Sequence, residues 1–350
     1  MVISSQFKLI IAIAIIFIVL GHSHQPANIF YPSYYFQVPL LFFVFGYFLD
    51  IRNTFKQKME SVFNFSKHKL TAYYSFNLLL FLGFLILRYL LVINEGEISF
   101  FDFFIEPFAG GHQFWLISAI WFIPILCVSY FLVQMLIWGN KSWIGLSLFL
   151  ILLVVFFISY NLKIGQSQGL YLFIIKTLLS SLYLLFGYNF KLHEQVIRKK
   201  ILNPTSILLL VVIIEMLRVN FGDLSIYFVN GEIANPNTIV PIISSFLIIL
   251  LSYIVCHYIS FLVNHSAFLE NVITYSLFIS MLHLFSFILL NFSLLVLGKI
   301  YLGDLLNLTY RHEFHISWIL YILLGMLLPI CFGKLVTRTS QKFLKFTSLF

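Results

Sequence analysis

AIAIIFIVLGHSHQP, residues 12–26, shows what kind of protein this chain is. An apolar run leads straight into His22, Ser23 and His24. A helix needs about 20 apolar residues to cross the hydrocarbon core of a bilayer, and residues 6–24 supply such a run. The stretch predicts a membrane-spanning helix with imidazoles at its far end. Either the helix reaches water there, or chemistry takes place there.

The composition of the whole chain fits a membrane setting. Hydrophobic residues make up 61% of the 350 residues and charged residues only 10%, whereas a soluble domain carries roughly 25% charged residues. We therefore expect an all-α polytopic membrane protein, because helices satisfy their own backbone hydrogen bonds in lipid. The lipid bilayer is the expected surrounding, and the chain is expected to form a single domain over residues 1–350.

Two classes of partner are not expected from the composition. The net charge of +8 is distributed over loops between apolar runs, so it indicates membrane topology and not binding to nucleic acid. The three cysteines, Cys127, Cys256 and Cys331, lie inside apolar runs and show neither metal-ligand spacing nor a disulfide framework. No metal site is expected.

Ten apolar runs are candidate transmembrane helices. They cover residues 6–24, 32–50, 70–93, 114–138, 143–160, 169–190, 204–220, 237–263, 271–296 and 314–333. Basic residues gather in 51–69, in 191–202 and after 333, whereas loops 94–108 and 220–237 contain no Lys or Arg. Short basic loops stay in the cytoplasm. A chain of about ten spans with both termini cytoplasmic places each of these basic segments on the cytoplasmic side. Loop 297–313, with two basic residues, fits less cleanly. Segment 51–69 has an apolar side and is expected to be an interfacial helix.

Two histidines are predicted to lie at matched depth in the outer half of the membrane. His22 follows Lys8, at the inner face, by fourteen residues, or roughly 20 Å of helix. His283 lies some twelve residues into another outward-running span. Histidine can move protons near neutral pH or carry an acyl group. The alternative is that each imidazole bonds a neighbouring carbonyl group and joins helices. Ser23 is a weak nucleophile candidate, because catalytic triads form in space and not in sequence.

Other polar residues in or near the spans allow a structural and a functional interpretation. Lys176 and Glu215 lie at similar depths in consecutive antiparallel spans, with Arg218 on the face of Glu215, and a structural ion pair is the favoured interpretation. A cluster that grips an anionic or hydroxylated ligand is the alternative. Lys67 and Lys69 precede a span, where positive-inside topology alone explains them. The alternative is that they hold the phosphates of a cytosolic donor.

Five fragments arrive in an order that resembles acyltransferase family 3: FKLIIAIAIIFIVLGHS, FQVPLLFFVFGYFL, AIWFIPILC, LYLLFGYNFK and NVITYSLFISMLH. Members of that family are membrane enzymes, typically of ten spans, that O-acylate envelope glycans with acetyl-CoA from the cytosol. The resemblance implies a bacterial inner-membrane O-acetyltransferase. Its donor would be acetyl-CoA (acyl-CoA), and its acceptor a polysaccharide, lipopolysaccharide or other glycolipid.

The resemblance also implies roles for particular residues. Three would be catalytic: His22, His283 and Ser276. Four would contact the donor: Lys8, Lys67, Lys69 and Trp121. This chain departs from the family pattern at several places: Ile11 stands where a basic residue is usual, Phe45 where Ser is, and Ser280 where Tyr is. The basic pair is Lys67 and Lys69, where the family more often has Arg. Lys8 is the nearest base to Ile11.

Three other classes of membrane protein are less consistent with the sequence than a transferase. A glycan transporter or flippase is the main rival, although the sequence shows no pair of broken helices. A polymerase of surface polysaccharide usually carries a long basic outer loop, whereas the outer loops here are short and mostly acidic or neutral. A channel is disfavoured because no stretch resembles a selectivity filter. Neither the oligomeric state nor the identity of the acceptor sugar follows from the sequence.

Overall fold

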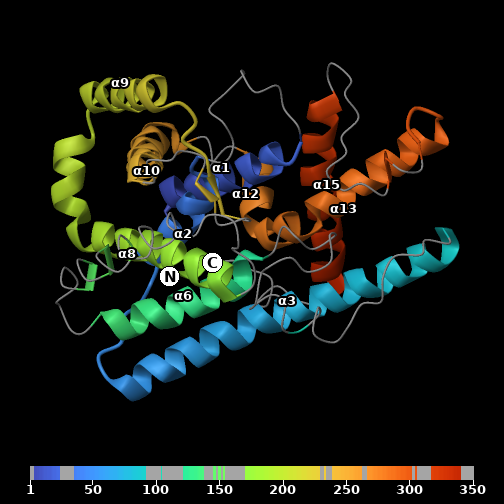
Figure 1. Ribbon diagram of the computed structural model, residues 1–350, viewed down its shortest axis with the longest axis horizontal. Coiled ribbons are helices and arrows are strands. Elements are labelled where there is room, and N and C mark those ends of the chain that lie inside the picture. The colour runs from blue at the N-terminus through green and yellow to red at the C-terminus, as the bar shows by residue number, and fades with distance from the viewer. Residues whose placement is uncertain are drawn as a thin grey trace.

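The computed structural model describes residues 4–23, 35–91, 104, 121–137, 145–146, 149–150, 153, 170–228, 232–233, 239–261, 266–301, 304–305 and 317–339. Helices dominate this part of the chain (Figure 1). They are α1 (Ser5–Gly21), α2 (Gln37–Tyr47), α3 (Phe55–Leu91), α6 (Phe122–Leu136), α8 (Leu170–Ile201), α9 (Pro204–Phe221), α10 (Ile239–Ile259), α12 (Ala267–Thr274), α13 (Ser276–Val296) and α15 (Ser317–Thr339). The two strands, β1 (Ile226–Tyr227) and β2 (Glu232–Ile233), form one short antiparallel pair.

The described helices agree with the predicted class of membrane protein. Five of them, α8, α9, α10, α13 and α15, are long and apolar enough to cross a membrane. Three shorter apolar helices, α1, α2 and α6, fall within predicted spans. The predicted span 143–160 lies almost wholly outside the described residues. The number of ten spans and the cytoplasmic side of the termini therefore stay predictions.

Two helices run further than the sequence indicated. The predicted interfacial segment 51–69 and the span 70–93 form one helix, α3, of 37 residues. Likewise α8 continues beyond residue 190 to Ile201 and ends with Arg198, Lys199 and Lys200. Charged residues mark where a membrane ends, but they do not stop a helix, because they retain good helix propensity.

Side-chain caps define the starts of several helices. The Ser4 hydroxyl accepts from the backbone N–H of Phe7 before α1. Asn203 accepts from the N–H of Ser206 at 2.7 Å, and Pro204 follows as the first residue of α9. Such caps satisfy donors that the helix itself leaves open, and proline is well suited to the first helical position. These local signals separate α9 from α8, although only two residues lie between the two helices.

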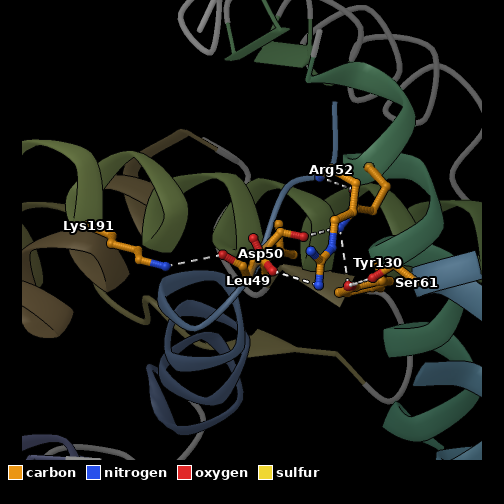
Figure 2. A network of polar contacts seen from close by, with 7 residues as sticks. Leu49, Asp50, Arg52, Ser61, Tyr130 and Lys191 are labelled. Carbon is orange, nitrogen blue, oxygen red and sulfur yellow. Dashed lines mark hydrogen bonds and ion pairs between the residues drawn. The ribbon is translucent and has the colours of Figure 1, made fainter. Parts of the chain in front are cut away.

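The loop that follows α2 is tied to α6 and α8 (Figure 2). Asp50 pairs with Arg52 at 2.9 Å, and its carbonyl oxygen accepts from the side-chain amide of Gln134 on α6 at 2.8 Å. Lys191 on α8 donates to the carbonyl oxygen of Leu49 at 3.3 Å. The segments that meet here were all predicted to lie on the same, inner face. Their meeting supports the alternation of spans.

Lys58, in the first part of α3, reaches the end of α6 nearby. Its ammonium group donates to the carbonyl oxygen of Ile137, the residue that caps the C-terminus of α6. A cation at this end of a helix complements the helix dipole. Burial of the side chain lowers the pKa of Lys58 below its ordinary value.

A carboxylate joins three helices on the side of the bundle that was predicted to be the inner one. Glu194 on α8 accepts hydrogen bonds from the hydroxyls of Tyr47 on α2, at 2.6 Å, and Tyr253 on α10, at 2.7 Å. Phe7 on α1 packs on the rings of both tyrosines. The arrangement fixes these ends of the helices around the start of α1.

Glycine allows the backbones of α2 and α8 to touch. A Cβ atom on Gly46 would lie 2.0 Å from the carbonyl oxygen of Leu184, and one on Gly187 would lie 2.0 Å from that of Phe43. Helices in membranes commonly associate through small residues that permit such close approach. The two glycines meet this need from both sides of one interface.

Helix α9 stands apart from the rest of the bundle. It packs on α10 at the upper left of Figure 1, and Ile214 is its one buried residue. Glu215 pairs with Arg218, three residues on, at 2.8 Å. The predicted ion pair between Glu215 and Lys176 is not among the ion pairs of the described residues. The prediction was wrong because α9 packs against α10, whereas Lys176 is buried on α8.

Candidate functional site

The two predicted histidines meet in the structure. His22 is the residue that caps the C-terminus of α1, and His283 lies in the middle of α13. Their ring centroids are 5.2 Å apart, with the ring planes inclined by 39°. The contact agrees with the prediction that the two imidazoles lie at the same height, whereas their depth in the outer half of the membrane stays a prediction. Two groups that can donate or accept protons lie side by side within an apolar bundle.

The tautomer of His283 follows from its hydrogen bond. Its Nδ1 atom lies 2.9 Å from the carbonyl oxygen of Ile279, one helical turn earlier. A carbonyl oxygen only accepts, so Nδ1 carries the hydrogen and Nε2 of the neutral ring is the basic nitrogen. The His283 side chain is fully buried, and its ring packs edge-on against Phe287. Its orientation is thus fixed, whereas His22 is partly exposed at the end of its helix.

His22 opens on a small cavity of about 40 Å³, which has room for about three water molecules. The cavity lies between the end of α1, the start of α2, the start of α6 and strand β1. Its walls are mainly apolar and aromatic. They are formed by Ile18, His22, Gln37, Val38, Leu41, Phe42, Phe45, Trp121, Phe122, Ile226 and Phe228. A mostly apolar pocket with a few polar groups is the usual form of a small-molecule site.

Trp121 forms one wall of this cavity. The residue is buried at the start of α6, and its ring lies parallel to that of Phe228 at 6.1 Å. The ammonium group of the buried Lys176 lies 5.1 Å from the centre of the Trp121 ring. A cation over the face of an indole is attracted by the ring electrons. Lys176 therefore contacts the Trp121 ring in the cavity wall, whereas Glu215 has its ion pair within α9.

Gln37 is a polar residue of the cavity that sequence reasoning missed. It is the first residue of α2, it is 2% exposed, and it lines the cavity together with His22. Phe36, the residue before it, provides no side-chain cap for the helix. The available signal was a lone amide inside the predicted span 32–50. A single amide near the end of a span is a weak signal, because a polar residue there normally faces water.

Ser276 lies at the start of α13, seven residues before His283. Seven residues are about two turns, so the two side chains share one face of the helix, roughly 10 Å apart along its axis. Ser276 and Ser280 are buried, and neither hydroxyl has a hydrogen-bond partner among the described residues. By contrast, Ser286 on the same helix donates to the carbonyl oxygen of Leu282. The two serines extend the polar face of α13 from His283 toward the N-terminal end of the helix.

The predicted donor-binding lysines lie at different places along the inner side. Lys8 pairs with Glu270 on α12 at 3.8 Å. On α3, Lys67 is exposed, whereas Lys69 is partly buried with its ammonium group 5.9 Å from the centre of the Phe65 ring. Two residues on a helix are about 200° apart in direction, so Lys67 and Lys69 do not share a face. The structure therefore does not place the four predicted donor contacts, Trp121 included, in one cluster.

The neighbours of His22 in sequence have other positions. Ser23 is buried, and its hydroxyl donates to the carbonyl oxygen of Leu20 at 2.7 Å. This bond favours a structural role for Ser23 at the end of α1. His24 lies outside the described residues. Among the residues that the structure describes, no group of three or more His, Cys, Asp or Glu side chains is suited to hold a metal ion.

Comparison with known proteins gives one clear result. The family model of the acyltransferase 3 domain matches residues 7–342, nearly the whole chain. No curated protein and no solved structure matches the chain. The match spans the helices that carry both histidines and the residues that line the cavity beside His22. The chain therefore belongs to the acyltransferase 3 family, and it is a multi-pass membrane acyltransferase.

Proposed function

We propose that this protein is a bacterial inner-membrane O-acyltransferase. It moves an acetyl group from cytosolic acetyl-CoA to a hydroxyl of a cell-surface polysaccharide or glycolipid. The observation that carries the proposal is the contact of His22 with His283 at the edge of a cavity, in a chain of an acyltransferase family. Acyl transfer to a hydroxyl needs a base for the hydroxyl proton, and an imidazole suits that task near neutral pH.

The reaction balances with His22 as the base. The acceptor oxygen attacks the thioester carbonyl carbon while His22 takes its proton. The carbon–sulfur bond then breaks, and the CoA sulfur leaves with the proton that the His22 imidazolium returns to it. His283 is proposed to hold the His22 ring in place. The two ring centroids are 5.2 Å apart, and the hydrogen bond to Ile279 fixes the His283 ring with Nε2 as its basic nitrogen. Ser276 lies on the same face of α13, nearer the inner side, where the acyl arm of the donor would enter.

The donor is proposed to approach from the basic inner side of the membrane. Its phosphates carry negative charge and stay in water, where Lys67 on α3 is exposed. Lys69 and Lys8 lie on the same predicted side, and Trp121 lies in the wall of the cavity. Only the uncharged acyl end would need to reach His22.

Replacement of Lys67 by alanine is expected to raise the KM for acetyl-CoA about tenfold while kcat changes little. The reason is that one charge-assisted contact with a phosphate contributes about 1.5 kcal/mol or more. Initial rates in membrane vesicles at several acetyl-CoA concentrations would measure both constants. Lys199→Ala, which removes a charge from the last turn of α8, is the matched control and should leave the KM unchanged. An unchanged KM in the Lys67 variant would show that Lys67 does not bind the donor and serves only to set the membrane topology.

The proposed activity is tested by supplying labelled acetyl-CoA to the inner side of vesicles that contain the protein. Label should appear in extracted glycan or glycolipid, and vesicles without the protein should show none. Each acetyl group that is transferred to glycan releases one CoA, so the amount of free CoA should rise in proportion to the labelled glycan. If the protein moves glycan across the membrane and no label is transferred, the transporter interpretation holds and the transferase proposal fails.

A further inference from the structure

Gln37 differs from the other buried glutamines of the described chain in its hydrogen bonds. Its Oε1 atom is shielded and accepts no hydrogen bond from the described residues. Gln6 donates to the carbonyl oxygen of Tyr253 at 2.8 Å, and Gln134 donates to that of Asp50 and accepts from the backbone N–H of Arg52. Buried amide groups are normally satisfied, and each exception calls for an explanation. The exception here lies on the wall of the cavity that His22 lines.

The atom without a partner limits what Gln37 can bind. A carboxamide oxygen only accepts hydrogen bonds, so its partner must be a donor. The carbonyl of a thioester offers no hydrogen, whereas a hydroxyl does. The hydrogen of the reacting hydroxyl is already assigned to His22 in the proposed reaction. A second hydroxyl of the same acceptor fits Gln37. An amide N–H of the donor's pantetheine arm is the alternative, and it would make Gln37 matter for release of CoA by water as well.

We propose that Gln37 binds the acceptor through a hydroxyl other than the one that is acylated, so that the cavity selects a polyhydroxylated acceptor. This inference rests on the proposed acyl transfer and adds a specificity-determining residue to it. The cavity has room for about three water molecules, so one hydroxyl-bearing edge of the acceptor would enter it and not a whole sugar ring. Phe42, Trp121 and Phe228 provide flat apolar walls, and Gln37 and His22 provide polar atoms in the same cavity.

The test compares Gln37→Met with Gln6→Met, because both changes replace a buried glutamine by an apolar side chain of similar length. Two reactions are followed in vesicles with labelled acetyl-CoA: transfer of label to glycan, and release of CoA by water when no acceptor is added. A third measurement is the melting temperature of each purified protein in detergent.

Gln37→Met is expected to lower transfer to glycan about tenfold, the loss that one hydrogen bond of about 1.4 kcal/mol produces. Release of CoA by water should stay at the wild-type rate, because that reaction uses His22 and the donor but no second hydroxyl. The melting temperature should be unchanged or higher, since an unsatisfied polar group is removed. Gln6→Met should melt at a lower temperature, because it loses a made hydrogen bond.

Three results would overturn the inference. A lower melting temperature for Gln37→Met, with both reactions reduced together, would show that Gln37 acts in packing. Transfer to glycan at the wild-type rate in Gln37→Met would show that the acceptor does not use this residue, and the proposed function would stand. Wild-type protein that transfers no label would remove the proposed function and this inference together.

Discussion

His22→Ala is expected to reduce acyl transfer about a thousandfold while the protein still accumulates in the membrane. General base catalysis contributes typically about 10²–10⁴-fold, and among the described residues that line the cavity His22 is the one ionisable side chain. The side chain lies at the C-terminal cap of α1 and is partly exposed, so its loss leaves only a modest gap. Transfer of label from acetyl-CoA to glycan, at equal protein levels in the membrane, measures the effect.

His257→Ala is the matched control for this prediction. His257 lies in the last turn of α10, at the predicted inner side, and its ring packs edge-on against Tyr258. Its variant should transfer label at the wild-type rate. Activity in His22→Ala within about tenfold of wild type would assign His22 to helix packing, because a general base contributes at least about 10²-fold. His283 would then be the remaining candidate for the base.

Gly187→Ala is expected to prevent correct folding or to cost about 3 kcal/mol or more of stability. The added Cβ would lie 2.0 Å from the carbonyl oxygen of Phe43 and 2.7 Å from the backbone nitrogen of Tyr47. Overpacking against side chains already costs about 1–3 kcal/mol, and a backbone cannot rotate away as a side chain can. Size-exclusion profiles in detergent after heating would measure the loss. Gly46→Ala, on the opposite side of the interface, should have a similar effect.

Gly145→Ala shows whether the expected loss is specific to the contact between α2 and α8. A Cβ at Gly145 would lie 3.1 Å from the carbonyl oxygen of Leu136, which requires only a small shift. Helical propensity favours alanine over glycine by about 1 kcal/mol. This variant should therefore remain within about 1 kcal/mol of wild type. If Gly187→Ala and Gly145→Ala lost the folded protein at the same temperature, the backbones of α2 and α8 would not lie in contact at Gly187.

Most of the architecture follows from apolar runs and from the placement of basic residues. The positions of α1, α10, α13 and α15 agree with predicted spans because no polar stretch interrupts them. Residues 267–296 show where this approach ends. The structure breaks the chain at Tyr275 into α12 and α13, whereas one apolar run was expected from 271 to 296. Hydropathy does not register the break, since Thr274, Tyr275 and Ser276 are compatible with a continuous helix.

The matched height of His22 and His283 was predictable because depth in a membrane is a one-dimensional quantity, whereas the contact of their rings was not. Counting residues from Lys8 and from the start of the ninth span gave the heights of His22 and His283, and their helices then had to be neighbours for contact. The partner of Lys176 was not predictable in this way. Its depth matched that of Glu215, but lateral packing decides which helices meet, and no pattern in one sequence reports it. The place of Gln37 in a cavity wall was not predictable either, because the other walls come from α1, α6 and β1, which lie elsewhere in the sequence.

The isolation of α9 makes the bilayer its main packing partner. Its outward residues, such as Leu208, Leu209 and Val219, are more than half exposed. Its 18 residues rise roughly 27 Å, close to the hydrocarbon thickness of about 30 Å. Membrane thickness therefore determines the tilt of α9. A thicker or thinner bilayer should change that tilt before the bilayer disturbs the histidine pair. Substitutions in α9 are then constrained mainly by the length of the helix and its apolar character, and many different apolar residues meet these two requirements.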